Sequence, residues 1–260
     1  MSDSIERAAE MLLEARREAA NHLKDLPETL RPRDEAAAYA IQKAVTDQLG
    51  PVVGWKVAPL KNGHSTCAAL NAKLVVASPA RVSSARFPMH GVEAEVAVKL
   101  GRDLPVREAP YTRAEVADAI AAFLPAIEVV QSRYLDSKAV SPLCALADHL
   151  SNGLLVTGTP VTGWGAIDLA RESVVATADD KVEISHTGMP GGDLLGEVVW
   201  LANVGSRWDG GLLAGQVITC GAWGGCHRVG PETHFAATFS HVGRVEMTFG
   251  QPRDDVYLEG

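Results

Sequence analysis

The stretch Val92-Glu93-Ala94-Glu95-Val96-Ala97-Val98 places two carboxylates in a segment that otherwise has the composition of a buried β-strand. Further along the chain, Ala126-Ile127-Glu128-Val129-Val130 has the same character and carries a third carboxylate. Alternate residues of a strand point to one face, so Glu93 and Glu95 share a face, with backbone positions roughly 6.5 Å apart. Burying an unpaired carboxylate costs several kcal/mol, so such groups are normally protonated, paired or bound to a metal ion.

Three carboxylates converge on one point if Glu128 faces the other two from a neighbouring strand. Oxygen ligands of this kind suit Mg²⁺ or Mn²⁺, with positions left for water or substrate. Two simpler interpretations stay open. Polar residues at every second position usually mark the solvated face of a sheet, although Ala97 on the glutamates' own face is small and nonpolar. Glu128 could also form an internal ion pair with Arg133 or Lys56.

The composition is typical of a globular enzyme and argues against a nucleic-acid or membrane protein. The hydrophobic fraction of 47% with 22% charged residues is ordinary for this class. A net charge of -8 without any Lys/Arg run disfavours nucleic acid as a partner. No apolar run is long enough to span a bilayer, and the acidic N-terminus is not a signal peptide, so we expect a cytoplasmic protein. The cysteines are scattered without a C-x-x-C pair and are expected to be free thiols: Cys67, Cys144, Cys220 and Cys226.

Residues 1–50 have the pattern of a helical pair. Residues 3–24 carry an apolar stripe at helical spacing, and Pro27 and Pro32 interrupt the pattern after it. A second helix is predicted from Asp34, a good N-cap, to Gln48, with Gly50 at its C-terminal end. These residues therefore predict an N-terminal helical cap.

From residue 51 onward, short strand-like segments separated by Gly, Pro, Asn and Ser replace the helical pattern. Strands are predicted at 52–57, 74–77, 92–100, 154–157, 173–178, 181–186, 216–220, 234–239 and 244–249. Hairpin turns are expected at residues 179–180 and 241–243. A capping box at residues 112–115 opens a helix that Pro125 should end or kink, and a further helix covers 194–203. The fold class is therefore α+β: an N-terminal helical segment, 1–50, on a mainly antiparallel β core that forms the catalytic domain, 51–260.

Two other segments carry candidate chemistry. Gly54-Trp55-Lys56-Val57 places a lysine in an apolar strand, where burial would lower its pKa and make it an acid or base near neutral pH. The alternative is a lysine whose ammonium group reaches the surface. Asp148-His149-Leu150-Ser151-Asn152-Gly153 can offer hydroxyl and backbone N–H groups to a carboxylate or an oxyanion, although it could equally be an ordinary loop.

Other familiar sites are disfavoured. His227, His234 and His241 recur every seven residues but share no face, so a histidine metal site is not expected. The glycine-rich segment 221–226 lacks the lysine of a P-loop. The patterns G-x-S-x-G and G-x-G-x-x-G are absent from the sequence, which argues against a serine hydrolase and a Rossmann cofactor site.

These segments resemble the 2-keto-4-pentenoate hydratase / 4-oxalocrotonate decarboxylase family of the fumarylacetoacetate hydrolase superfamily, over most of the chain. The most specific similarity is residues 92–105, which match the family's E-x-E strand and the R-D-L-P turn after it. Four further segments are similar to family motifs: residues 124–133 to the third-ligand segment, 54–57 to G-[YW]-K, 148–153 to D-N-x-S-x-G without its Asn, and 198–202 to the V-W-L-A helix.

The resemblance implies a fold like that of the fumarylacetoacetate hydrolase C-terminal domain and a cofactor, Mg²⁺ or Mn²⁺, held by Glu93, Glu95 and Glu128. It implies that a 2-oxo acid substrate chelates this metal through its carboxylate and 2-keto oxygen. The cation would then act as a Lewis acid and stabilise the developing enolate.

The resemblance also implies roles around the metal. Lys56 would be the catalytic acid/base or charge partner, and Ser151 and Asp148 would bind the substrate. Family members generally assemble into homo-oligomers, so a homo-oligomer is expected here.

Two departures from the family concern the surroundings of the metal. The family's meta-cleavage hydratases carry an acidic residue between the lysine and the E-x-E strand, whereas residues 67–80 contain none. Cys220 stands where the family usually has a threonine, and the loop after it is longer. We expect a hydratase of aromatic catabolism that acts on a small unsaturated 2-oxo acid such as 2-hydroxypenta-2,4-dienoate. The alternatives are a decarboxylase or C–C hydrolase of a related 2-oxo acid, and a noncatalytic metal- or ligand-binding protein of the same fold.

Overall fold

The helices frame a β-rich molecule in the computed structural model, which describes residues 2–59 and 65–251. Within these ranges the α-helices are α1 (Ser2–Arg17), α2 (Glu35–Leu49), α3 (Arg113–Ala119), α4 (Pro142–Ala147) and α5 (Leu194–Asn203). The Asp34 side chain caps α2 by accepting a hydrogen bond from the Ala37 N–H at 2.8 Å. Gly50 follows α2 with a φ of 100°, a conformation that glycine adopts at little cost. The predictions of α2 and α5 are thus confirmed, whereas the first helix ends at Arg17 and is shorter than the predicted 3–24.

The larger sheet has eight strands and carries the acidic stretch near its centre. Its order is β2-β1-β12-β5-β7-β8-β3. The eighth strand, β13, lies on the same side of β5 as β12 and pairs with an earlier part of it, residues 91–94, whereas β12 pairs with residues 97–99. Antiparallel pairs dominate, while β1–β12 and β3–β8 are parallel. The strands are β1 (Val52–Pro59), β2 (Ser65–Asn71), β3 (Val75–Ala77), β5 (Gly91–Leu100), β7 (Ile120–Val130), β8 (Asn152–Thr157), β12 (Val217–Thr219) and β13 (Trp223–Arg228).

A second sheet of five strands has the order β10-β9-β14-β15-β4. Both predicted hairpins are confirmed in it, because β9 pairs with β10 and β14 pairs with β15, each antiparallel. The strands are β4 (Ala80–Ser83), β9 (Ser173–Ala178), β10 (Lys181–Thr187), β14 (His234–Phe239) and β15 (Gly243–Gly250). A small two-stranded sheet joins β6 (Leu104–Pro105) to β11 (Gly211–Leu212).

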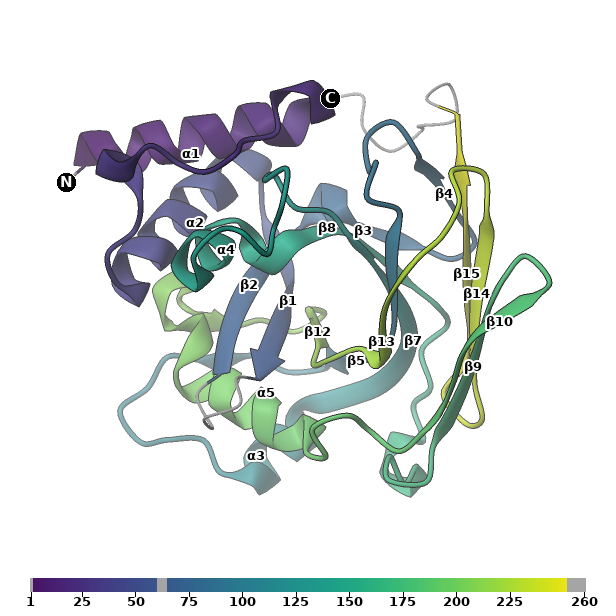
Figure 1. Ribbon diagram of the computed structural model, residues 1–260. Coiled ribbons are helices and arrows are strands. Elements are labelled where there is room, and N and C mark those ends of the chain that lie inside the picture. The colour runs from purple at the N-terminus through teal and green to yellow at the C-terminus, as the bar shows by residue number, and fades with distance from the viewer. Residues whose placement is uncertain (1, 60–64, 252–260) are drawn as a thin grey trace.

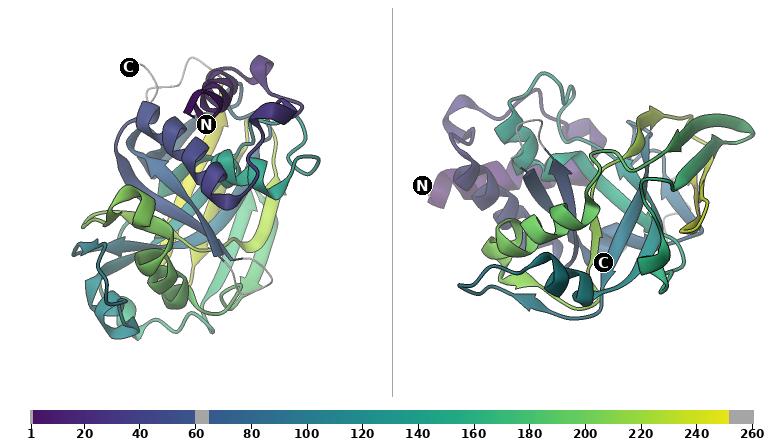
Figure 2. Two further views of the ribbon diagram at one scale, coloured as in Figure 1. Left: turned by 90° about the vertical axis from the view of Figure 1, so that its left-hand side faces the viewer. Right: turned by 90° about the horizontal axis from the view of Figure 1, so that it is seen from below.

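In Figure 1 the N-terminal helices lie at the upper left, the larger sheet runs through the centre, and the five-stranded sheet lies at the right. Seen from below, the N-terminal helices and the five-stranded sheet lie on opposite sides of the larger sheet (Figure 2, right). The main apolar core joins residues of the larger sheet, such as Ile127 and Val129, to residues of the five-stranded sheet, such as Phe235 and Val245. The α+β class and the largely antiparallel β core are therefore confirmed.

The N-terminal helices have a second core of their own. Buried residues of α1 and α2, such as Leu12 and Ile41, pack in one cluster with Tyr134 and with Cys144 of α4. The cap therefore shares its packing with a segment from the middle of the chain, and the boundary at residue 50 stays a prediction. None of the helices in the two described ranges is both long and apolar enough to cross a membrane.

Several local predictions differ from the structure. Helix α3 ends at Ala119, and Pro125 lies inside β7 instead of ending a helix. Within β7, residues from Ala126 onward pair with β8. Pro125 lies just outside this paired stretch, where the N–H group that a proline lacks is least needed. Strands β2, β4 and β13 and helix α4 were not expected. The sequence of β2, STCAALN, lacks polar alternation because all of its residues are buried.

Candidate metal centre

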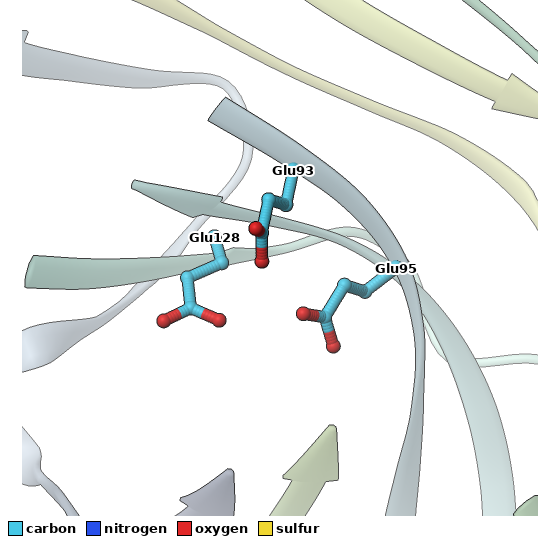
Figure 3. Close-up of side chains that lie close together, drawn as sticks. All are labelled: Glu93, Glu95 and Glu128. Atoms are coloured by element: carbon cyan, nitrogen blue, oxygen red, sulfur yellow. The ribbon is translucent and has the colours of Figure 1, made fainter. Parts of the chain in front are cut away.

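Strands β5 and β7 bring the three glutamates together. The strands are antiparallel neighbours, and their register places Glu93 opposite Glu128 and Glu95 opposite Ala126. Because residues opposite one another, and every second residue along a strand, share a face, all three side chains lie on one side of the sheet. Their carboxylates converge in Figure 3, and one oxygen of each lies within 4.8 Å of the others.

Burial makes this cluster electrostatically unfavourable without a cation. Glu95 is 1% exposed and Glu128 is fully buried. Burial, followed by the negative charges of Glu128 and Glu93, raises the pKa of Glu95 well above its usual value. The pKa of Glu93 is also raised by burial, although Lys56 opposes the shift. One oxygen of Glu95 and one of Glu128, Oε2 in each case, are buried without a hydrogen-bond partner. Two buried oxygen atoms of this kind, together with the third carboxylate that converges on them, fit a hard divalent cation.

Lys56 lies beside the glutamates because β1 reaches β5 through β12. The register pairs Lys56 with Thr219 and Thr219 with Ala97, so Lys56 shares the face of the acidic residues. Its Nζ atom donates a hydrogen bond of 2.8 Å to Glu128 Oε1 and one of 3.3 Å to the Leu150 carbonyl. The alternative of an ion pair between Glu128 and Lys56 is therefore present in the structure.

The expected lowering of the Lys56 pKa is wrong. Burial does act to lower it, but the charges of Glu128, Glu93 and Glu95 together outweigh burial and raise the pKa. Lys56 is thus an ammonium cation at neutral pH in the metal-free protein. The lysine does not reach the surface as an exposed charge, since its side chain is only 13% exposed.

The segment 148–153 reaches the site through an unusual backbone. Three consecutive residues, His149, Leu150 and Ser151, have φ values of 52°, 52° and 61°, which L-residues rarely adopt. This turn points the Leu150 carbonyl at Lys56. Ser151 is half-buried, and its hydroxyl makes no hydrogen bond to another described residue.

The side chain of Asp148 contacts Arg133 and Ser132 instead of the glutamates. Its side chain forms a buried ion pair with Arg133 Nε, and its Oδ2 accepts hydrogen bonds from Ser132 Oγ at 3.2 Å and from the Arg133 N–H at 3.0 Å. Arg133 is therefore the partner of Asp148 and not of Glu128. The structure brings Lys56 and the three glutamates together, and Ser151 lies in the chain between Leu150, which contacts Lys56, and Asn152, which contacts Glu128, whereas Asp148 contacts Arg133 and Ser132.

One residue at this site was missed. Asn152 is the first residue of β8, and its Nδ2 donates a hydrogen bond of 3.1 Å to Glu128 Oε1. The only signal in the sequence was an amide residue at the end of a polar turn, directly before an apolar strand. That signal does not reveal which carboxylate the amide contacts.

Two cysteines border the site, and all four are free thiols, as expected. Burial and the charges of Glu93 and Glu128 raise the pKa of Cys226 to about 11. Cys220 is buried, and burial raises its pKa well above the usual value. Both thiols are therefore protonated at neutral pH and make poor nucleophiles.

Other polar groups and hollows lie outside this centre. The histidines at 227, 234 and 241 each approach a different carboxylate, of Glu183, Glu246 and Glu172 respectively. Surface hollows of about 730 and 520 Å³ are lined by residues around β10 and around α2, and none of the three glutamates lines either. The chemistry therefore centres on the face of β5 and β7.

Comparisons with known proteins find a matching family and similar chains. The family described as "Fumarylacetoacetate (FAA) hydrolase C-terminal" matches residues 33–259. The chain is 30% identical to a 2-keto-4-pentenoate hydratase of Burkholderia vietnamiensis, over 96% of this chain and 99% of that protein. It is 28% identical to 2-keto-4-pentenoate hydratase 2 of Dechloromonas aromatica, over 93% of this chain and 96% of that protein.

A solved structure shows the same fold. The 4-oxalocrotonate decarboxylase from Pseudomonas putida G7, complexed with magnesium and adipate, superposes with a TM-score of 0.80 at 21% identity. The match covers 95% of this chain and 97% of that one.

Proposed function

The chain belongs to the fumarylacetoacetate hydrolase family as a hydratase-like enzyme, and on this premise we propose that it adds water to a small unsaturated 2-oxo acid with the help of a divalent cation. The observation that carries the proposal is the convergence of three carboxylates, two of them buried and Glu93 partly buried, within 4.8 Å of one another and beside Lys56. Relatives named 2-keto-4-pentenoate hydratase support a substrate such as 2-hydroxypenta-2,4-dienoate.

Glu93, Glu95 and Glu128 would hold the cation, Mg²⁺ or Mn²⁺. The unpartnered oxygens of Glu95 and Glu128 and the carboxylate chemistry of all three residues fit such an ion. When bound, the cation would supply a Lewis acid for the carboxylate and 2-keto oxygen of the substrate and would stabilise negative charge as it develops there.

Lys56 would move protons next to this centre. Its ammonium group is held between Glu128 Oε1 and the Leu150 carbonyl, so its position is fixed before substrate arrives. Lys56 would donate a proton to the terminal carbon of the 2-hydroxydienoate while the 2-hydroxyl group releases its proton to solvent, and water would then add across the conjugated double bond of the resulting 2-keto acid. Charge neutralisation of the glutamates by a cation would lower the pKa of Lys56 from its raised value and ease this transfer.

The loop beside Lys56 would bind the rest of the substrate. The Ser151 hydroxyl is free of other described partners and would hold the substrate carboxylate. Both oxygens of Asp148 are engaged by Arg133 and Ser132, so Asp148 would serve substrate binding by fixing this loop.

Turnover assays test the reaction. Purified protein would be given 2-hydroxypenta-2,4-dienoate with Mg²⁺, Mn²⁺ or EDTA, while loss of dienol absorbance is followed and the product is identified by NMR. We expect metal-dependent formation of a 4-hydroxy-2-oxo acid. Release of CO₂ from oxalocrotonate, without hydration of the dienoate, would establish decarboxylation instead. Absence of turnover for both compounds, with Mn²⁺ bound, would support the noncatalytic alternative.

A double substitution tests the metal ligands. Glu93→Gln with Glu95→Gln removes two ligand charges and should abolish measurable Mn²⁺ binding in calorimetry. The matched control is Glu183→Gln with Glu246→Gln, which removes the same charge from partly exposed positions of the five-stranded sheet. Mn²⁺ binding that survives the first double change would show that the ligand assignment is wrong.

A further inference from the structure

The two oxygens of Glu128 have different surroundings. Oε1 accepts hydrogen bonds from Lys56 Nζ at 2.8 Å and from Asn152 Nδ2 at 3.1 Å, whereas Oε2 has no partner. The carboxylate is fully buried, so water at the protein surface does not compete for either oxygen. The protein therefore occupies one oxygen of Glu128 and leaves the other available.

The orientation of the Asn152 amide follows from its contact with Glu128. An ionised carboxylate only accepts hydrogen bonds, so the NH₂ group of the amide must face it. That orientation leaves Asn152 Oδ1 buried without a partner, in a side chain that is 1% exposed. A buried acceptor without a partner is unfavourable, because it has lost its hydrogen bonds to water. The Asn152 side chain thus keeps its hydrogen bond to Glu128, while its own Oδ1 atom is left without a hydrogen bond.

The backbone carbonyl of Asn152 is held by two arginine side chains. This carbonyl accepts hydrogen bonds from Arg133 Nη1 at 2.6 Å and from Arg16 Nη1 at 3.4 Å. Arg133 is fixed in turn by its buried ion pair with Asp148. The amide group therefore projects toward Glu128 from a rigid support.

On the basis of the metal site proposed above, we propose that Asn152 is a positioning residue that holds Glu128 Oε1 and so presents Oε2 to the divalent cation. Groups that orient a metal ligand typically change metal affinity or activity by about 10- to 100-fold when removed. Lys56 places a positive charge next to the same oxygen, whereas the neutral amide of Asn152 donates a directional hydrogen bond that orients the carboxylate.

Mn²⁺ affinity tests this role independently of turnover. Free Mn²⁺ would be titrated by EPR against wild-type protein, Asn152→Ala and the volume-conserving Asn152→Leu, with folding of each checked by circular dichroism. We expect both variants to bind Mn²⁺ about 10- to 100-fold more weakly than wild type. Asn152→Leu guards against an effect of the cavity that alanine leaves.

Asn71→Ala is the matched control. Asn71 is another fully buried asparagine whose Oδ1 lacks a partner, but its Nδ2 donates to the carbonyls of Gly50 and Thr46 at 2.7 and 3.3 Å. Its loss should lower thermal stability and leave Mn²⁺ affinity unchanged within experimental error.

The outcomes separate the two proposals. Wild-type protein that does not bind Mn²⁺ would refute the metal site itself. Wild-type protein that binds Mn²⁺, together with folded Asn152 variants of equal affinity, would refute only the positioning role. An equal loss of affinity in Asn71→Ala would also overturn it, since the effect would then reflect general loosening of the fold.

Discussion

Replacing Lys56 with methionine should destabilise the metal-free protein strongly at neutral pH and much less in acid. The ammonium group is paired with Glu128 and lies close to the charges of Glu93 and Glu95. Methionine keeps most of the side-chain volume and removes the charge. Two buried carboxylates and the partly buried Glu93 then lie together without a cation, and the folded state reduces their repulsion only by binding protons.

The magnitude follows from the geometry of the pair. At the observed Nζ–Oε1 distance of 2.8 Å, Coulomb's law with an effective dielectric constant of about 20 gives an attraction of roughly 6 kcal/mol. Removing the ammonium also removes the cost of burying it, so the net loss is smaller. Loss of one partner of a buried ion pair typically costs about 3–5 kcal/mol, which corresponds to a decrease in Tm of about 6–20 °C for a protein of this size.

The pH dependence has a defined sign. The pKa of Lys56 is raised by the glutamates, so its pairing stabilises the fold below the ordinary lysine pKa for as long as these carboxylates are charged, and it is lost at high pH as pH rises through the raised value. The pKa values of Glu93 and Glu95 are raised as well, so these groups take up protons as pH falls and then no longer need the lysine. The difference between variant and wild type should therefore shrink as pH falls from neutral into the acid range.

Thermal and urea unfolding in EDTA, over this pH range, measure the effect. Lys43→Met is the matched control, because Lys43 pairs with Asp47 at 2.7 Å but both side chains are exposed, 44% and 57%. An exposed pair of this kind contributes about 0.3–0.5 kcal/mol. An unchanged free energy of unfolding for Lys56→Met at neutral pH, or a loss that does not diminish in acid, would refute the electrostatic account of this site.

Three further results are expected. Mn²⁺ affinity should rise with pH, because the cation must displace protons from Glu95, whose pKa is raised by burial and by the neighbouring carboxylates. Calorimetry in two buffers of different ionisation enthalpy should detect the release of protons on binding, and absence of that release would contradict the raised pKa of Glu95. Asp148→Ala should lower the free energy of unfolding by about 3–5 kcal/mol in urea titrations, since Arg133 would lose its buried partner; a loss typical of a surface pair would mean that Arg133 reaches solvent. Asp34→Ala should cost about 1 kcal/mol by removing the cap of α2, and an unchanged Tm would show that this cap does not stabilise the protein.

Local patterns in the sequence were sufficient for much of the secondary structure. Helix α2 begins after Asp34 and ends before Gly50, as predicted, because caps act through neighbouring backbone groups. The hairpin turns between β9 and β10 and between β14 and β15 were also predictable, since turn residues act locally. The prediction that Pro125 ends or kinks a helix was wrong. A proline is tolerated at this position of β7 because the pairing with β8 does not include it, and no local pattern shows where that pairing stops.

The partners of the charged residues could not be assigned from sequence. Glu128 had two candidate partners, Arg133 and Lys56, and only the folded chain shows that it pairs with Lys56 while Arg133 pairs with Asp148. The direction of the Lys56 pKa shift was wrong for a related reason. Burial alone would lower the pKa, but the sign depends on the sum of burial and all nearby charges, and those charges come from other strands.

The sequence by itself determined that Glu93 and Glu95 share one face, because the two-residue period of a strand is a property of the local backbone. Only the tertiary structure decided that Glu128 stands opposite Glu93, that Lys56 reaches them across β12, and that Asn152 contacts Glu128. These contacts join residues far apart in the chain, and their register is set by the packing of the whole sheet.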